Sequence, residues 1–195
     1  MTWAGRAIKR LVDLVVAVLL LLLLWPVFLV LAILIRRGSP GPAIFRQERA
    51  GRDMKPFTMY KFRTMRPDVD PFGVSPAGAE DPRLTRLGRW LRETSIDELP
   101  QLWNILKGDM GLVGPRPLYM SQAREFTEHQ RRRLEARPGI VGLAQIRGRG
   151  ELPHEAKLEL DVQYVEQMSL AQDLKILWRG FVMILRRQGI YQKWR

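Results

Sequence analysis

The chain has 195 residues, of which 46% are hydrophobic and 27% are charged, and this balance excludes both a disordered chain and a polytopic membrane protein. It contains no cysteine, which excludes disulfides, zinc–thiolate sites and thiol catalysis. It contains only two histidines, so carboxylates are the available metal ligands, and they suit a hard ion such as Mg²⁺.

The net charge of +12 is unevenly distributed along the chain. Residues 1–66 carry 12 basic and 3 acidic side chains, whereas the remaining residues carry 20 basic and 17 acidic ones. Near an anionic membrane surface each basic group contributes about 1 kcal/mol to binding. The excess therefore favours a membrane surface over nucleic acid as the main partner, and no nucleic-acid partner is expected.

An uncharged apolar segment of 22 residues, Leu14–Ile35, is long enough to cross a bilayer as a helix. Pro26 lies near its middle and removes one backbone hydrogen bond, so the helix is expected to kink or break there. Both flanks are basic, with Lys9-Arg10 before the segment and Arg36-Arg37 after it. Because the positive-inside rule places such flanks in the cytoplasm, the segment is expected to leave through the leaflet that it enters. A single span with a proline kink is the alternative.

The next part of the chain predicts a small β-hairpin and a loop. A cluster of Gly, Ser and Pro at 38–42 ends the apolar segment. Residues 43–47 and 56–63 are rich in aromatic and apolar side chains, and the turn-like stretch 50–53 separates them, which is typical of a hairpin. Residues 68–81 are rich in proline, glycine and acidic side chains and predict a loop.

Helices are predicted over most of the remaining chain. A short basic helix is expected over 84–92, and apolar residues at helical spacing followed by Gly108 predict another over 99–107. One further helix is expected from Ser121 to the basic run at 131–133, and a second over 155–168. The fold class predicted is therefore α+β, mostly helical with a small β-hairpin.

The last helix is expected over 170–187, with Ser169 as its N-cap. Its apolar residues, including Trp178, lie near one side, with basic residues among them. This pattern suits an amphipathic helix in the membrane interface. A core helix with solvated charges is an equally good interpretation of the same pattern.

Two adjacent carboxylates, Asp97 and Glu98, precede the apolar positions of the 99–107 helix. Ser95 and Glu98 have the spacing of a capping box, and on that interpretation the acids only begin a helix. If Asp97 is the cap instead, Pro100 falls in the first turn, where proline is tolerated. In either case the acids are expected at a helix N-terminus, which favours ionised carboxylates and phosphates.

The same residues allow phosphoryl chemistry. An ionised Asp97 can attack phosphorus and form an acyl-phosphate, and Glu98 can help to hold Mg²⁺, which neutralises a diphosphate. Arg92 precedes the pair, and Arg116 follows between Pro115 and Pro117. A guanidinium binds phosphate through two parallel hydrogen bonds. From spacing alone, the helix-cap interpretation of the pair remains open.

At these residues the chain resembles the bacterial sugar transferase family, the monotopic polyprenyl-phosphate phosphoglycosyl transferases. The resemblance covers nearly the whole chain in the family's order. The matching motifs are Lys9-Arg10-x-x-Asp13, Gly41-Pro42, Arg46-Gln47-Glu48-Arg49-x-Gly51-Arg52, Tyr60-Lys61-Phe62-Arg63-Thr64-Met65, Ser95-Ile96-Asp97-Glu98-Leu99-Pro100-Gln101, Asn104-Ile105-Leu106-Lys107-Gly108-Asp109-Met110, Val113-Gly114-Pro115-Arg116-Pro117, Arg137-Pro138-Gly139-Ile140-x-Gly142-Leu143-Ala144-Gln145 and Leu160-Asp161-x-x-Tyr164-Val165.

The resemblance implies an enzyme that transfers a sugar 1-phosphate from a UDP-sugar to a polyprenyl phosphate, undecaprenyl phosphate being the expected lipid, and releases UMP. It implies a covalent phosphosugar–aspartate intermediate and a role at the start of surface polysaccharide or glycoconjugate synthesis. By this resemblance Asp97 is the nucleophile, Asp97 and Glu98 are the ligands of Mg²⁺, and Arg92 and Arg116 bind phosphate. Lys61 and Arg63 are expected to contact the donor, with a structural or membrane-facing role as the alternative.

The resemblance also implies a re-entrant helix-break-helix at 1–37 and a catalytic domain at 38–195 on the cytoplasmic face of the bacterial inner membrane, with both termini cytoplasmic. Lys9 and Arg10 are expected to meet the lipid phosphate at the interface among membrane lipids, and a homodimer is a possible assembly. One departure affects the break, because relatives often have Ser before the membrane proline and this chain has Trp25 before Pro26. Trp25 is instead expected to anchor at the acyl–headgroup boundary. An inactive membrane scaffold is the alternative function.

Overall fold

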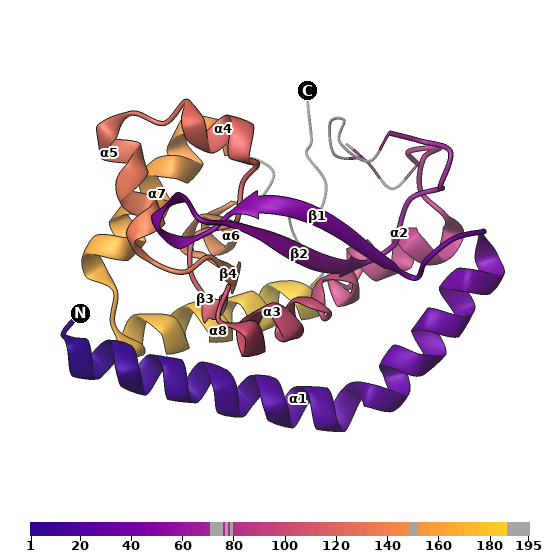
Figure 1. Ribbon diagram of the computed structural model, residues 1–195, viewed down its shortest axis with the longest axis horizontal. Coiled ribbons are helices and arrows are strands. Elements are labelled where there is room, and N and C mark those ends of the chain that lie inside the picture. The colour runs from indigo at the N-terminus through magenta and orange to yellow at the C-terminus, as the bar shows by residue number, and fades with distance from the viewer. Residues whose placement is uncertain (71–75, 77, 79, 149–151, 187–195) are drawn as a thin grey trace.

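The computed structural model describes residues 1–70, 76, 78, 80–148 and 152–186. Its elements are mostly helices, with two small sheets of two strands each (Figure 1). The predicted fold class is confirmed to this extent. The predicted loop at 68–81 lies partly outside the described residues, as does the predicted helix end at Arg187.

Helix α1, Trp3–Gly38, is the one described helix that is long and apolar enough to cross a membrane by length and composition. It continues through Pro26 without a gap in the helix assignment. Figure 1 shows that it follows one side of the molecule and bends, so that its second half rises at an angle to the first. A proline inside a helix is a common cause of such a bend.

Both halves of α1 pack against the same folded unit. In the first half Ala17 is fully buried in the main core, and in the second half Leu31 and Ile35 are buried in a second cluster with Phe62 and Leu91. A straight helix perpendicular to a membrane could not keep both halves against one unit on one side of the bilayer. The large apolar side chains on the other faces of α1 are exposed.

The predicted hairpin is confirmed. Strand β1, Ile44–Ala50, pairs antiparallel with β2, Pro56–Phe62, in the register Ile44–Phe62, and a 3₁₀ turn over Arg52–Met54 joins them. The first strand runs three residues further than predicted, because the left-handed backbone that reverses the chain lies at Asp53 (φ 54°) and Met54 (φ 61°).

A second sheet was not predicted. Strand β3, Gly111–Val113, pairs parallel with β4, Gly139–Val141, and the short helix α6, Leu143–Arg147, follows. Three residues are too few to show a two-residue alternation, so the sequence gives no strand signal there. Strand β4 also lies very close to the residue that follows β3, since a Cβ atom added at Gly139 would lie 2.1 Å from the backbone nitrogen of Gly114.

The single helix predicted from Ser121 to residue 133 is wrong. The chain forms α4, Met120–Arg124, then α5, Glu128–Arg131, and then a 3₁₀ turn over Arg132–Glu135. Thr127 begins a new helix because its hydroxyl accepts from the backbone N–H of Gln130, whose side chain accepts from the backbone N–H of Thr127. That capping box begins a second short helix within the segment where a single helix was expected.

The other predicted helices are confirmed with small changes at their ends. They are α2, Arg86–Glu93, α3, Gln101–Lys107, α7, His154–Gln167, and α8, Leu170–Leu185. Gly108, in the left-handed region at φ 92°, ends α3, and the Ser169 hydroxyl caps α8 by accepting from the Gln172 N–H.

Helix α8 is amphipathic in the fold as well as in the sequence. Its inner face buries Asp173, Ile176 and Gly180, whereas Trp178 and Phe181 on the outer face are 65% and 55% exposed. Helices α1, α3 and α8 lie together along the lower side of the molecule in Figure 1. Each of these helices has exposed apolar side chains, among them Trp103 on α3 and Trp178 on α8, and such side chains suit a membrane interface.

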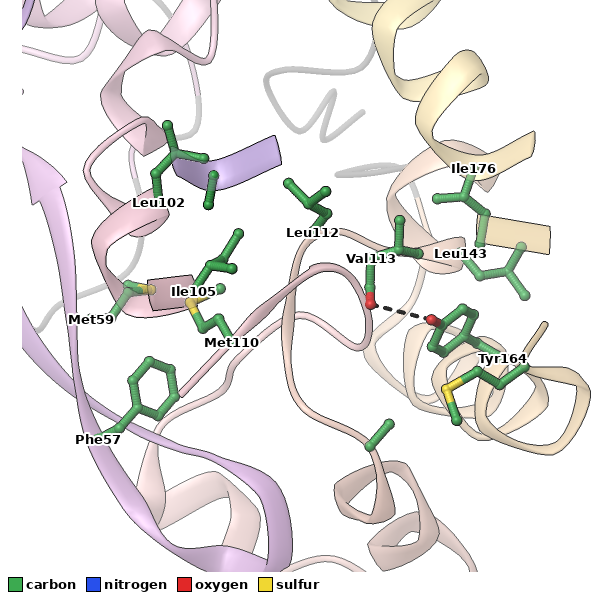
Figure 2. Packing of buried hydrophobic residues seen from close by; sticks show 13 residues of the cluster. Phe57, Met59, Leu102, Ile105, Met110, Leu112, Val113, Leu143, Tyr164 and Ile176 are labelled. Carbon is green, nitrogen blue, oxygen red and sulfur yellow. Dashed lines mark hydrogen bonds between the residues drawn. The ribbon is translucent and has the colours of Figure 1, made fainter. Parts of the chain in front are cut away.

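The main core joins these helices to the two sheets. Figure 2 shows Leu102, Ile105 and Met110 packed on one side of Val113, and Tyr164, Leu143 and Ile176 on the other. The Tyr164 hydroxyl lies 3.2 Å from the Val113 carbonyl and 2.7 Å from Asp173 Oδ1. This core holds β3, and the segment after β3 carries Arg116.

Candidate active site

The dyad lies in a tight turn directly before α3. Ile96–Glu98 form a 3₁₀ turn, and Leu99 and Pro100 continue it into α3 with helical backbone angles. The acids therefore precede a helix, as predicted, but neither predicted cap forms. Ser95 has a left-handed backbone at φ 57° and its side chain makes no cap hydrogen bond, so the prediction of a capping box at Ser95 and Glu98 is wrong. The alternative prediction of Asp97 as the cap is wrong as well, because Pro100 is the residue directly before α3. A left-handed Ser95 turns the chain sharply between α2 and the dyad.

A polar cavity of about 550 Å³ opens over the dyad. It is bordered by β2, by the last turn of α2, by the dyad turn, by the segment after β3 and by the start of α7. It brings together six of the residues predicted from the sequence, namely Lys61, Arg63, Arg92, Asp97, Glu98 and Arg116. Its volume is in the range typical of sites for small-molecule ligands.

Glu98 is held by two cations. Lys61 Nζ and Arg116 Nη2 lie 2.6 Å and 3.0 Å from the same oxygen, Glu98 Oε1. Burial raises the pKa of Glu98, but Arg116 and Lys61 outweigh this effect and hold the pKa well below its usual range. Lys61 and Arg116 therefore hold Glu98 in place and favour its ionised form.

Asp97 is placed differently. Its residue is 7% exposed, and within the described part of the chain no hydrogen bond fixes its carboxylate. Burial raises the pKa of Asp97 to about 6, with Lys61 opposing this shift and the negative charge of Glu98 adding to it. Two neighbouring carboxylates with different pKa values suit different roles, and Asp97 is the one whose oxygens are available for reaction.

Arg92 and Arg116 are positioned by their neighbours. Arg92 Nε donates to Thr64 Oγ1 at 2.9 Å, and the Thr64 residue is buried. The backbone carbonyl of Arg116 accepts from Arg133 at 2.6 Å, and Arg133 in turn pairs with Asp161 at 2.6 Å in the protein interior. Both guanidinium groups border the cavity, so both are placed to contact an anion inside it.

Arg63 has mainly structural contacts. Its guanidinium donates to the carbonyls of Pro40 and Ser39 at 2.7 Å and 2.8 Å, and also to the Ser39 hydroxyl. With a further bond to the Ile35 carbonyl at 3.3 Å, these contacts tie Arg63 to the last turn of α1 and to the residues that directly follow it. Arg63 therefore joins the end of the long apolar helix α1 to β2 at the rim of the cavity.

The other predicted residues lie outside the cavity lining. Lys9 pairs with Asp173 at 2.6 Å, and Arg10 donates to the carbonyls of Ile105 and Met110. These contacts attach the first half of α1 to α8 and α3. Trp25 and Pro26 are exposed on α1. Asp13 adds to the attachment, since its carboxylate accepts from the Leu112 N–H at 3.2 Å.

Sequence reasoning gave no role to a group on β1 that also borders the cavity. The Arg49 guanidinium stacks 3.6 Å from the centre of the Tyr119 ring, and Gln47 Nε2 lies 3.2 Å from the Tyr119 hydroxyl. Burial lowers the pKa of Arg49 to about 10. The family motif that contains Arg49 was the only sequence signal that singled out this residue, and nothing in the sequence indicated its contact with Tyr119.

The donor set suits Mg²⁺ bound with few protein ligands. Asp97 and Glu98 supply carboxylate oxygens at one wall of the cavity, and one Glu98 oxygen is already shared by two cations. Among the described residues no group of three or more His, Asp or Glu side chains gathers in metal-binding geometry. Mg²⁺ commonly uses one or two carboxylates together with substrate phosphates, so the site fits Mg²⁺ and not an all-protein cage.

Residues 4–187 match the family described as bacterial sugar transferase. The chain belongs to this family. It is 47% identical over 186 residues to an uncharacterized sugar transferase, EpsL, of Bacillus subtilis, covering 95% of this chain and 91% of the relative. The family prediction and the predicted class of enzyme, a phosphoglycosyl transferase, are both confirmed by the comparisons.

Two further relatives carry names that state a reaction. A UDP-glucose:undecaprenyl-phosphate glucose-1-phosphate transferase of Caulobacter vibrioides is 44% identical, with 94% of this chain and 72% of the relative covered. An undecaprenyl-phosphate galactose phosphotransferase of Salmonella typhimurium is 36% identical, with 96% of this chain but 42% of the relative covered. The chain thus spans less than half the length of the Salmonella protein.

Proposed function

We propose that this chain transfers a sugar 1-phosphate from a UDP-sugar to undecaprenyl phosphate or a similar polyprenyl phosphate, releasing UMP, and so initiates a surface polysaccharide or glycoconjugate. The observation that carries the proposal is the arrangement of the dyad in the polar cavity. An available carboxylate, Asp97, lies beside a fixed one, Glu98, and three cationic side chains surround them.

The reaction we propose has two displacements at one phosphorus atom. An Asp97 carboxylate oxygen attacks the phosphorus that carries the sugar, and the bond to the bridging oxygen breaks, so that UMP leaves with that oxygen. An oxygen of the lipid phosphate then attacks the same phosphorus and breaks the acyl-phosphate bond, which restores Asp97 and forms polyprenyl-diphosphate-sugar. Splitting one transfer into two steps in this way is nucleophilic catalysis.

The neighbouring groups divide the other tasks in this proposal. Arg92 and Arg116 bind the phosphates of the donor, since guanidinium groups match phosphate oxygens in pairs. Lys61 keeps Glu98 ionised and in place and reduces the negative charge near Asp97. Asp97 and Glu98 together would hold Mg²⁺, which when bound neutralises phosphate charge.

We also propose that α1 re-enters the cytoplasmic leaflet and that both termini are cytoplasmic, with 1–37 as the membrane element and 38–195 as the catalytic domain. The contacts of both halves of α1 with one folded unit support this. So do the basic residues at the two ends of the apolar segment. In this arrangement the dyad works at the interface, where a soluble nucleotide-sugar and a membrane lipid can meet.

Release of UMP tests the function directly. Purified protein would be incubated with a panel of UDP-sugars, with and without undecaprenyl phosphate, and UMP would be measured. We expect one donor to give sustained UMP release only when the lipid is present. Glucose and galactose donors come first, because relatives are named for these sugars. No UMP from any donor would favour the inactive scaffold instead.

A further inference from the structure

A second, smaller cavity of about 130 Å³ lies next to the dyad. Three parts of the chain form its walls, which are residues 95–99, the β4–α6 segment and the inner face of α8. Aliphatic side chains make up most of the lining, namely Leu99, Ile140, Ile146, Met183 and Ile184. Glu98 borders this apolar cavity and the large polar cavity alike.

The apolar cavity offers little to a ligand that needs many hydrogen bonds. Gln145 also borders it, but the Gln145 Nε2 donates to the Ile140 carbonyl at 3.0 Å. The Gln145 Oε1 is closed to solvent and lies toward Gly142, where an added Cβ would be 3.0 Å away. A hexose or a nucleobase placed there would lose hydrogen bonds to water without replacing them. The donor therefore suits the polar cavity, and this one suits a hydrocarbon group with a polar head at Glu98.

We propose that this cavity binds the isoprene unit next to the phosphate of the polyprenyl acceptor. The inference rests on the proposed function, because it takes a prenyl phosphate to be the second substrate. An apolar cavity of about 150 Å³ can hold a benzene-sized molecule, so this volume suits one isoprene unit. With the unit in the cavity, the attached phosphate lies on the Glu98 side, where Lys61 and Arg116, the two cations at Glu98 Oε1, offset its repulsion from the carboxylate and hold it beside the phosphorus that it attacks.

Helix α8 links this cavity to the membrane side of the protein. Its inner residues Gly180 and Ile184 line the cavity, whereas Phe181 and Leu185, one position further along, are 55% and 67% exposed. Gly180 also allows α8 to approach β4 closely, since a Cβ there would lie 2.9 Å from Val141 Cγ1. The rest of the prenyl chain can thus leave the cavity along an apolar helix that lies at the interface.

Two tryptophan substitutions on neighbouring positions of α8 test the proposal. Ile184→Trp fills the cavity, and Leu185→Trp is the matched control, because Leu185 is exposed and does not line it. Two quantities would be measured, the KM for undecaprenyl phosphate and the amount of sugar-phosphate adduct formed from UDP-sugar without lipid. We expect Ile184→Trp to raise the acceptor KM at least about tenfold and to leave adduct formation within about twofold, as an overpacked apolar contact predicts. Leu185→Trp should change neither quantity.

Other results would overturn the proposal. An unchanged acceptor KM in a folded Ile184→Trp protein means that the acceptor does not use this cavity. A parallel loss of adduct formation means that the cavity serves the donor.

A second experiment uses the unaltered protein and a prenyl phosphate with a photoreactive group in its first unit, and it requires neither a variant nor turnover. Labelling of the peptides that contain Ile140 or Ile184 supports the proposal, whereas labelling confined to α1 contradicts it. If no variant forms an adduct or releases UMP, the proposed function fails, but the labelling still reports on the cavity.

Discussion

Arg133 donates a hydrogen bond of 2.6 Å to the backbone carbonyl of Arg116. Arg133 is only 2% exposed, and its charge is balanced by Asp161, whose carboxylate accepts from both Nε and Nη2. The buried pair therefore fixes the backbone of the residue whose own side chain reaches Glu98. This makes Arg133 and Asp161 positioning residues for the dyad, although neither borders the polar cavity.

Replacing Asp161 should reduce turnover through Arg116. In Asp161→Asn the buried Arg133 loses its balancing charge, so we expect kcat to fall about tenfold and the free energy of unfolding to fall by roughly 3 kcal/mol. Glu159→Gln is the control on the same helix, because Glu159 pairs with His129 at the surface. Kinetics of UMP release and denaturant unfolding check both effects. Full activity in a destabilised Asp161→Asn protein would remove the positioning role.

Lys61 should set the acid limb of the pH–rate profile. In the proposed reaction Asp97 must be ionised to attack, and burial raises its pKa to about 6, so kcat/KM is expected to fall as the pH drops through that value. Lys61 lowers the pKa of Asp97, so Lys61→Met should move the acid limb to higher pH, whereas Lys61→Arg should leave it near its original position. Profiles that coincide for Lys61→Met and the unaltered protein would contradict this role, as would a shift in the opposite direction.

Neutralising Asp97 should stabilise the fold above pH 6. The folded-state pKa of Asp97 is raised to about 6, so the ionised form costs stability, and this cost grows as the pH rises from about 4 to about 6. We expect Asp97→Asn to gain on the order of 1–3 kcal/mol in free energy of unfolding at pH 7–8 and little at pH 4. Urea unfolding at several pH values measures the difference. If Asp97→Asn raised the free energy of unfolding equally at every pH, or lowered it at pH 8, then ionised Asp97 would not destabilise the fold.

The path of α1 can be probed because the chain has no cysteine. Single cysteines in place of Trp3 and Arg37, both exposed near the ends of α1, should react with a membrane-impermeant thiol reagent only from the cytoplasmic side. Pro26→Leu should straighten the helix, so the two halves would no longer both reach the folded unit and activity should fall. Labelling of the two cysteines from opposite sides of the membrane would contradict re-entry.

The sequence allowed the elements with strong local signals to be predicted. Helices α3 and α8 follow from apolar residues at helical spacing together with Gly108 and Ser169 at their ends, and the hairpin follows from two aromatic and apolar runs around a turn-like stretch. The parallel pair of β3 and β4 could not be found in this way, since each strand has three residues and the partners lie far apart in the chain. The division of the 121–133 region into two helices depends on a capping box at Thr127 and Gln130 that was not used in predicting one helix there.

For the candidate site, too, some features could be predicted from the sequence and others could not. Motif resemblance selected Asp97, Glu98, Lys61 and Arg116, and the structure places all four at one cavity. The turn that presents the dyad was not predictable, because a left-handed Ser95 is a rare backbone state that the surrounding fold must impose. The stacking of Arg49 on Tyr119 joins residues 70 positions apart, so no local pattern indicates it. The lipid-phosphate role of Lys9 and Arg10 stays a prediction beside the protein contacts that both residues make.

Intact mass and peptide mapping after reaction with the donor alone test the central claim most directly. Protein incubated with its UDP-sugar, without any polyprenyl phosphate, should gain the mass of one sugar phosphate, located on the peptide that contains Asp97. Adding undecaprenyl phosphate should then remove the adduct and yield polyprenyl-diphosphate-sugar, and Asp97→Asn should form no adduct. An active enzyme that shows no adduct on this peptide, with both substrates required before any UMP appears, would contradict a phosphosugar–Asp97 intermediate.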